Sequence, residues 1–413
     1  NKGNYALSLG NLCRWLGEQA ESLGVNIFPG FAASEILYDK DGAVRGIATG
    51  DMGIGLDGEK KDSFTPGYEL LARYTIFAEG CRGHLGKQVI RNFDLDVNSG
   101  TQHYAIGFKE LWSIPPEKHQ KGKVLHSIGW PLGFTPSATG GSYLYHLPDN
   151  QVALGMIVDQ SYQTPHLSPY DEMQRWKHHP LISEVLEGGE RISYGARALV
   201  KGGLQALTAN AFPGGLIVGD DSGFLNPLKI KGSHTAMKSG MLGAEAVFEE
   251  LALGNSETTP STFEEKFKSS WLFDELHRAR NFGPIAHKMG ILFGGIYSSL
   301  ERFIRPIARW TFKDPIPDYA TLQEASKTEK IKYPKPDGVI SFDKLSSVFL
   351  SNTYHEEDQP CHLKLQDPSI PISANLPKYD EPAQRYCPAG VYEVLEEENG
   401  ERKFQINAQN CVH

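Results

Sequence analysis

The chain has few cysteines, no long apolar run and no excess of positive charge. Five cysteines in 413 residues are too few for a disulfide framework, which favours a reducing compartment. No apolar stretch approaches the roughly 20 residues that a membrane-spanning helix needs, and no signal-like segment follows the first residue, Asn1. The net charge of −9, without a cluster of lysines or arginines, argues against a nucleic-acid partner. The length and the 40% hydrophobic content instead favour a globular protein of two or three domains.

Residues 214–250 carry the most informative pattern. They begin as a short apolar strand, break into a turn rich in Gly, Asp, Ser and Asn, and continue as a long helix. Within the helix Ala236, Gly240 and Ala244 recur every four positions, which predicts a packed face. The turn lies outside the carboxyl end of the strand, where α/β folds bind ligands. The unpaired N–H groups that begin such a helix suit a phosphate or the negative edge of a reduced flavin.

Asp220 ends this strand. Its carboxylate would repel a phosphate, but it could accept hydrogen bonds from the hydroxyls of a ribityl chain. A strand ending in Gly-Asp, then a Gly/Pro turn and a Gly-x-x-x-Ala helix, resembles the C-terminal flavin motif of FAD proteins with the glutathione-reductase type of fold. An ordinary βα unit with a polar loop is the alternative.

The first 97 residues predict one helix followed by strands. We expect an amphipathic helix over 5–24 and strands over 25–28, 33–37 and 43–48. A further apolar strand, 74–78, ends in Glu79-Gly80, with a helix opening at about Gly83. Gly80 therefore marks a second turn where backbone could meet a dinucleotide.

Residues 98–205 are rich in aromatic residues and glycine. Strands over 104–110, 141–146 and 151–158 predict a mostly antiparallel sheet between the two flavin-contacting stretches. A Pro-rich loop, 127–136, carries Trp130, Leu132 and Phe134. This loop is either exposed or tucked onto its own sheet.

Residues 273–310 predict helices. The apolar run 289–300 is too short to span a bilayer, and basic residues flank it. That pattern favours a helix in the membrane interface, with a buried core helix as the alternative. The flanking residues are His287, Lys288, Arg302, Arg305 and Arg309. Residues 313–340, rich in proline, predict a linker or strap.

The tail holds Cys387, followed by proline, and Cys411, 24 residues later, on either side of a predicted hairpin. This pattern is typical of ferredoxin clusters, where a tight loop and one distant cysteine hold the iron. Two cysteines cannot complete a cubane, and two unrelated thiols are the alternative. The remaining cysteines lie outside the spacing of a cluster and are expected to be inert.

Taken together, these motifs closely resemble the electron-transfer flavoprotein–ubiquinone oxidoreductase family over nearly the entire chain. The segments that carry the resemblance are TIFAEGCRGHLGKQ (75–88), GWPL (129–132), GGSYLYHLP (140–148), GGLIVGDDSGFLNPLKIKGSHTAMKSG (214–240), RYCPAGVYE and INAQNCVH. The resemblance implies a mixed α/β and α+β fold. It comprises a two-dinucleotide-fold (glutathione-reductase-type) FAD domain, an inserted quinone-binding sheet and a C-terminal ferredoxin-like domain.

The implied boundaries are 1–97 and 206–270 for the FAD domain, 98–205 for the ubiquinone-binding domain, 271–340 for a helical membrane-facing segment and linker, and 341–413 for the [4Fe–4S] domain. A first βαβ unit would precede Asn1, and two more cluster cysteines would follow His413. We therefore expect this stretch alone to be inactive.

The resemblance also implies residue roles, matched motif by motif. FAD would be held by Gly80, Gly219, Asp220, Gly223, Asn226, Gly232, Ser233 and Thr235. Ubiquinone would meet the backbone of Gly140 and Gly141, and the cluster would bind Cys387 and Cys411. No acid–base catalytic residue is expected.

The implied function is to accept electrons from reduced electron-transfer flavoprotein, through the cluster and FAD, and to reduce ubiquinone to ubiquinol. The protein would lie peripherally on the cytoplasmic face of a bacterial inner membrane or the matrix face of a mitochondrial one. The alternatives are a flavin monooxygenase or prenyl reductase of the same fold, which would not use the tail cysteines, and a non-catalytic membrane-associated scaffold.

Overall fold

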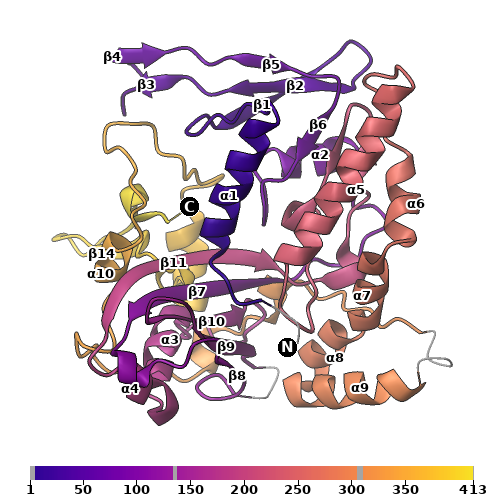
Figure 1. Ribbon diagram of the computed structural model, residues 1–413. Coiled ribbons are helices and arrows are strands. Elements are labelled where there is room, and N and C mark those ends of the chain that lie inside the picture. Colours follow the sequence, from indigo (N-terminus) through magenta and orange to yellow (C-terminus); the bar gives the residue numbers. More distant parts are fainter. Residues whose placement is uncertain (1–4, 134–136, 305–309, 413) are drawn as a thin grey trace.

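The computed structural model describes residues 5–133, 137–304 and 310–412. Its largest layer is a five-stranded antiparallel sheet, in the lower half of Figure 1, with the strand order β11-β7-β10-β9-β8. The strands are β7 Tyr104–Ser113, β8 Val124–Ser127, β9 Gly140–His146, β10 Gln151–Asp159 and β11 Glu190–Val200. The antiparallel sheet predicted for residues 98–205 is thus present.

Helices α3 Pro169–Lys177 and α4 Pro180–Leu186 help to cover this sheet. Side chains from the sheet and both helices, among them Phe108, Leu154 and Met173, form one buried cluster. Half-buried side chains from residues 322–350 pack against the same cluster. Residues 313–340 are therefore a strap laid along the sheet domain, with short 3₁₀ turns at Asp318–Thr321 and Ala325–Lys327.

The upper half of Figure 1 holds two kinds of sheet. In the first, β6 Thr75–Phe77 pairs in parallel with β13 Gly215–Ile217, and β12 Ala211–Phe212 adds an antiparallel edge. The others are antiparallel. Their strands are β1 Ala33–Tyr38, β2 Val44–Thr49 and β5 Glu69–Leu71 in one sheet, and β3 Met52–Ile54 and β4 Lys60–Thr65 in the other.

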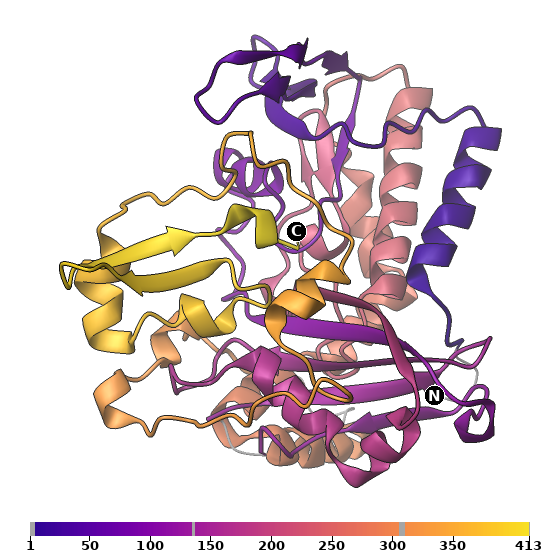
Figure 2. The ribbon, with the colours of Figure 1, turned by 90° about the vertical axis from the view of Figure 1, so that its left-hand side faces the viewer.

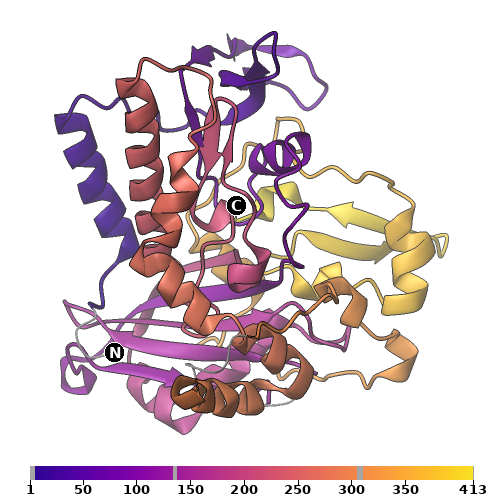
Figure 3. The ribbon, with the colours of Figure 1, turned by 90° about the vertical axis from the view of Figure 1, so that its right-hand side faces the viewer.

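Five helices accompany these strands. They are α1 Leu9–Ser22, α2 Gly86–Asn92, α5 Ser233–Ala252, α6 Thr262–Lys268 and α7 Trp271–Ala279. Figures 2 and 3 show α1 at the margin of the molecule beside α5, with the tail on the opposite side.

Three expectations for this half are corrected. The predicted packed face of α5 is wrong, because Ala244 is exposed and a Cβ on Gly240 would meet no atom within 4 Å. The helix instead buries Thr235, Ser239, Leu242, Gly243, Ala246 and Glu250. Residues 25–28 form no strand, since none of the described residues pairs with them. Helix α2 begins at Gly86 rather than near Gly83.

Helices α8 Phe282–Met289 and α9 Ile291–Ile304 pack on each other below α7 (Figure 1). No helix in the described part of the chain is both long and apolar enough to cross a membrane. The buried-core alternative for this run is wrong, because Leu292, Phe293 and Ile296 are each about half exposed. His287 does not join an exposed basic face, since its half-buried ring pairs with Asp314 at 2.7 Å. Arg305, Arg309 and the side chain of Arg302 lie outside the described residues.

The tail is a small unit beside the sheet domain (Figure 2). Its predicted hairpin is confirmed as β14 Tyr392–Glu396 paired with β15 Arg402–Ile406. Short helices α10 Lys344–Phe349, α11 Leu376–Tyr379 and α12 Ala383–Tyr386 surround it.

Candidate functional site

The two glycine turns predicted to meet a dinucleotide lie at one edge of a parallel sheet. Strand β13 pairs with β6 in register, Ile217 opposite Phe77, so the chain leaves both strands side by side. The turns that follow contain Gly80 (φ 86°) and Gly219 (φ 66°), in the left-handed region that glycine tolerates without strain. A Cβ on Gly80 would meet no atom within 4 Å, which leaves room beside this turn. This edge has the position and openness that a bound dinucleotide requires.

Two carboxylates tie the turns together. Asp221 accepts hydrogen bonds from the N–H groups of Glu79 (3.3 Å) and Gly83 (3.2 Å), although these residues are far apart in the sequence. The carboxylate of Glu79 in turn accepts from the N–H groups of Leu85 (3.3 Å) and Gly86 (2.6 Å) at the start of α2. A Cβ on Gly83 or Gly86 would collide with these carboxylates. Burial raises the pKa of Asp221 to about 6.

Asp220, the predicted acceptor for ribityl hydroxyls, lies where the unit that contains β6 and β13 (the flavin side) meets the sheet domain. Its Oδ2 accepts a hydrogen bond from the N–H group of Val200, the last residue of β11, at 3.4 Å. No hydrogen bond to its Oδ1 forms among the described residues. Burial raises the pKa of Asp220 to about 6, and burial together with the Asp220 charge raises the pKa of the Cys81 thiol to about 12. Cys81 is therefore a protonated thiol at neutral pH, which agrees with its expected inertness.

The start of α5 is an uncapped helix end. Gly232 occupies the N-cap and supplies no side-chain acceptor. The N–H groups of Ser233, His234 and Thr235 find no acceptor among the residues that the structure describes. The Thr235 hydroxyl donates to the carbonyl of Phe224 at 2.6 Å, so it fixes the preceding loop. Three free N–H groups and the positive end of a 20-residue helix dipole suit an anionic group.

Asn226 and Gly223 shape the loop between β13 and α5. The Asn226 Oδ1 accepts from the N–H groups of Leu228 and Lys229, both at 3.1 Å, and its Nδ2 donates to Glu275 at 2.9 Å. A Cβ on Gly223 (φ 102°) would lie 2.8 Å from the side chain of Gln102. The side-chain amide of Asn226 is thus engaged in its own turn, and the flavin contacts of both residues stay predictions.

The predicted quinone residues, Gly140 and Gly141, begin β9. Strand β8 pairs with β9 only as far as Ser127 opposite Ser142, so both glycines extend beyond β8. A Cβ on Gly140 would collide with the Ile157 carbonyl of β10 and lie 2.6 Å from a methyl of Leu132. Glycine is therefore required at position 140 for close packing, and the quinone contact itself stays a prediction.

Buried polar groups lie at the same end of the sheet. Asp159, at the end of β10, pairs with the ammonium of Lys201 and accepts a hydrogen bond from the hydroxyl of Thr139. All three residues are buried. Lys201 follows Val200, the residue that contacts Asp220, and Thr139 precedes Gly140. These three side chains therefore connect Asp220 with the two glycines that begin β9.

The loop predicted to carry exposed aromatic residues lies partly against the sheet domain. Trp130 is half exposed, and its ring centroid lies 5.7 Å from that of His179 and 5.9 Å from the guanidinium of Arg175. Leu132 is half-buried, and Phe134 lies outside the described residues.

Cys387 and Cys411 are buried in one cluster with Ala389 and Val391. The N–H group of Val391 donates to the Cys387 sulfur at 3.4 Å. Burial and the charges of the cysteines at 387, 411 and 361 raise the pKa of Tyr392. The two predicted ligands thus share one apolar, hydrogen-bonded environment of the kind that iron–sulfur clusters occupy.

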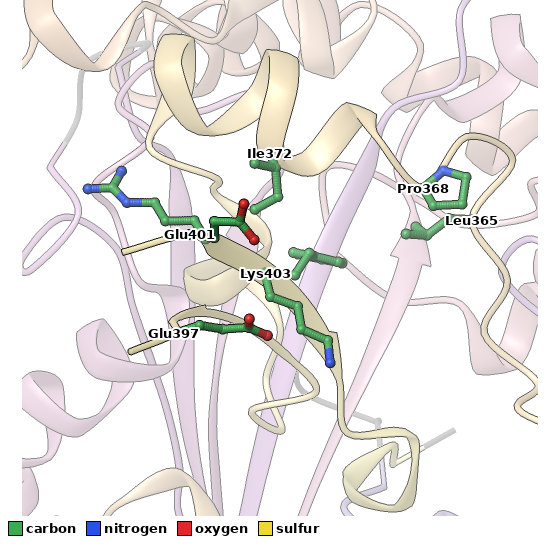
Figure 4. Close-up of a pocket in the computed structure, with 8 residues that line it drawn as sticks. Leu365, Pro368, Ile372, Glu397, Glu401 and Lys403 are labelled. Carbon is green, nitrogen blue, oxygen red and sulfur yellow. The ribbon is translucent and has the colours of Figure 1, made fainter. Parts of the chain in front are cut away.

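The hairpin also forms two surface cavities. One, of about 380 Å³, is lined by Glu397, Glu401 and Lys403 on the hairpin and by Leu365, Pro368 and Ile372 opposite (Figure 4). The other, of about 360 Å³, is lined by Lys344, Gly390 and Tyr392 among others, close to Cys387. The Lys344 ammonium donates to the Cys387 carbonyl at 3.1 Å.

Comparison with known proteins first defines the fold. A geranylgeranyl bacteriochlorophyll reductase-like protein from Thermoplasma acidophilum matches 76% of this chain and 72% of its own with a TM-score of 0.50 and 14% identity. At that identity the likeness establishes a shared mixed α/β architecture.

Sequence comparison then defines the family. The family model "ETF-QO, ubiquinone-binding" matches residues 104–199, and "Electron transfer flavoprotein-ubiquinone oxidoreductase, 4Fe-4S" matches residues 338–413. The electron transfer flavoprotein-ubiquinone oxidoreductase of Pseudomonas aeruginosa is 59% identical over the whole chain, which covers 75% of it. The human mitochondrial protein of the same name is 51% identical, and the chain covers 68% of it. The chain belongs to the electron transfer flavoprotein-ubiquinone oxidoreductase family.

Proposed function

We propose that the protein oxidises reduced electron-transfer flavoprotein and reduces ubiquinone to ubiquinol, using FAD and a [4Fe–4S] cluster. One observation carries this proposal. The two family matches fall on the two units that the chemistry needs, the antiparallel sheet with its glycine pair and the hairpin with its buried cysteines. A flavin monooxygenase or a prenyl reductase would have no use for the second unit.

FAD fits the edge formed by β6 and β13. Gly80 and Gly219 would let the backbone approach the dinucleotide, and Asp220 has a carboxylate oxygen free for ribityl hydroxyls. The N–H groups that open α5 at Ser233 and Thr235 would stabilise negative charge on the reduced ring through the helix dipole. FAD and an iron–sulfur cluster supply the electron transfer that side chains cannot perform. The chain positions them and excludes water.

Cys387 and Cys411 would supply two of the four thiolates that a cubane cluster takes. The Val391 N–H group already donates to one of these sulfurs. Such a donor stabilises the extra negative charge of a reduced cluster, whereas burial opposes that charge. Gly140 and Gly141 would offer backbone groups to a quinone carbonyl without adding charge.

We assign the domains as the sequence predicts, with the flavin unit at 1–97 and 206–270, the quinone unit at 98–205, a membrane-facing segment and linker at 271–340, and the cluster unit at 341–413. Helices α8 and α9 are the proposed membrane contact. They expose an apolar set made of Met289, Leu292, Phe293, Ile296, Leu300 and Phe303. Such a surface, too short to span, suits peripheral binding to a bilayer.

The full-length protein that carries these residues tests the reaction. We expect FAD and four irons per chain, and reduction of a short-chain ubiquinone when reduced electron-transfer flavoprotein is added. Cys387→Ser should lose the iron and the reaction while keeping the FAD. Full quinone reduction by an iron-free Cys387→Ser protein would contradict the proposed route.

Vesicle binding tests the membrane contact separately. Replacing Phe293 and Ile296 with glutamate should release the protein from phospholipid vesicles in a flotation assay. Leu253→Glu, at a still more exposed leucine directly after α5, should leave binding unchanged. Equal retention of both variants on the vesicles would exclude α9 as the contact.

A further inference from the structure

One buried and two half-buried side chains from distant segments converge next to the first residue of β7. His103 precedes β7, His287 lies in α8, and Asp314 begins the strap. The Oδ2 of Asp314 is 2.7 Å from the Nδ1 of His287 and 3.2 Å from the Nε2 of His103. The two imidazole rings meet edge to face with their centroids 4.5 Å apart. Two nitrogens and one oxygen thus lie within 4.8 Å of one another, close enough to hold one metal ion.

A fourth residue orients this set. The Oδ1 of Asp318 lies 2.7 Å from the Nδ1 of His103, and its Oδ2 accepts a hydrogen bond from the N–H group of Tyr104 at 2.7 Å. In the neutral ring whose proton lies on Nδ1, facing this carboxylate, the Nε2 of His103 has a lone pair available to a metal at the centre. A carboxylate behind a histidine is the outer partner that metal-bound histidines usually have.

The Nε2 of His103 is itself unsatisfied. His103 is 5% exposed, and this nitrogen makes no aligned hydrogen bond within the described part of the chain, although Asp314 lies near it. A buried polar atom without a partner is costly and indicates a missing ligand. A lone pair facing a carboxylate oxygen at 3.2 Å also repels it unless a proton or a metal ion lies between them.

We propose that His103, His287 and Asp314 bind a divalent transition-metal ion of the zinc class through Nε2, Nδ1 and Oδ2. Nitrogen and carboxylate ligands suit Zn²⁺, which binds them at about 2.0–2.2 Å in a tetrahedron, with water in the remaining position. Ligand atoms in such a tetrahedron lie about 3.3–3.5 Å apart by the geometry of those bonds. The distance of 3.2 Å from His103 Nε2 to Asp314 Oδ2 is close to this range. The distance of 2.7 Å from His287 Nδ1 to the same oxygen would need to increase by less than about 1 Å.

The ion would fasten three parts that the quinone reaction brings together. It would join the first residue before the quinone sheet, the helix pair proposed to touch the membrane, and the strap that covers the sheet. The site requires neither the flavin nor the cluster, so it stands whether or not the proposed reaction is correct.

Zinc content in the full-length protein tests this proposal. The protein is loaded in excess Zn²⁺, dialysed against metal-free buffer, and analysed for zinc and iron by mass spectrometry. We expect one zinc per chain, and none in His103→Gln or His287→Gln. Asp318→Asn should weaken zinc binding about 10- to 100-fold without abolishing it, because it alters only the outer partner. Unchanged iron in these variants shows that they remain folded.

Two controls separate this site from others. His84→Gln replaces an exposed histidine and should keep the zinc. The only other group of possible metal ligands in the described chain is His355, His362 and Cys411. Cys411→Ser removes one of these ligands, and this variant should also keep its zinc. The proposal would be overturned if the wild-type protein held no more zinc than His103→Gln, or if Cys411→Ser lost the zinc. His103, His287 and Asp314 would then be held together by hydrogen bonds alone. X-ray absorption at the zinc edge should show nitrogen and oxygen ligands and no sulfur.

Discussion

Helix α3 of the sheet domain and helix α1 of the unit that contains β6 and β13 are buried to very different degrees. Helix α3, on the sheet domain, buries seven of its nine residues, whereas α1, on the flavin side, buries none of its 14. Both helices begin with a serine N-cap whose hydroxyl accepts a backbone N–H. Local sequence signals therefore formed both helices equally well, and only tertiary contacts distinguish them.

The apolar stripe of α1 shows what this difference means. Leu9, Trp15 and Leu16 are each 42–54% exposed, so about half of each apolar side chain remains in water. Hydrophobic burial stabilises a fold only where the apolar surface leaves water. We therefore expect α3 to contribute far more than α1 to the stability of the chain.

The largest expected effect tests the comparison directly. Phe108→Ala, in the sheet core, should lower the free energy of unfolding by about 3–5 kcal/mol, the usual cost of emptying a buried phenylalanine site. Trp15→Ala, on α1, should change it by less than about 0.5 kcal/mol, as exposed substitutions do. Urea denaturation of the 413-residue chain measures both. A cost above about 1 kcal/mol for Trp15→Ala would mean that α1 is covered in solution.

The next effect concerns the link between the two flavin turns. Asp221→Ala leaves the N–H groups of Glu79 and Gly83 without their acceptor, which should cost about 1–3 kcal/mol of unfolding free energy. Asp62→Ala, at an exposed position, is the matched control and should be neutral. The same denaturation experiment applies. If the two variants are equally stable, Asp221 does not hold the turns together.

A smaller effect separates backbone strain from cofactor binding. Gly80 (φ 86°) on the flavin side and Gly122 (φ 79°) on the sheet side both have open space where a Cβ would go. Alanine at either position should therefore cost a similar strain energy of about 1–2 kcal/mol. In the full-length protein only Gly80→Ala should also weaken FAD binding, measured by the loss of flavin on dialysis. Equal flavin loss from both variants would mean that the turn at Gly80 does not face FAD.

Part of the sheet domain followed from the sequence, because the predicted strands 104–110, 141–146 and 151–158 are largely apolar and pair as β7, β9 and β10, whereas β8 and β11 were not predicted. The buried face of α5 could not be predicted, since regularly spaced small residues at 236, 240 and 244 do not show which neighbour packs on the helix. Asp221 was also missed. Its partner Glu79 lies 142 residues away, and only the parallel pairing of β6 with β13 brings them together. The Gly-Asp motif drew attention to Asp220, while the adjacent acid makes the structural contact.

The smallest effect lies where the two regions meet, at Asp220. Burial raises the pKa of this carboxyl to about 6 in the folded chain, so below pH 6 it holds a proton. Hydrogen bonds from ribityl hydroxyls would favour the ionised form and lower that pKa, so FAD binding would release the proton. The affinity for FAD should therefore rise with pH, by about tenfold between pH 5 and pH 7, and level off above.

Flavin fluorescence titrations of the full-length protein across this range measure that rise, and Asp220→Asn should remove it. A slope that survives in Asp220→Asn would assign the proton to Asp221, whose pKa burial also raises to about 6. FAD binding would then release its proton from Asp221, which joins the two turns. Asp220, which accepts a hydrogen bond from Val200 of the sheet domain, would not be the titrating group.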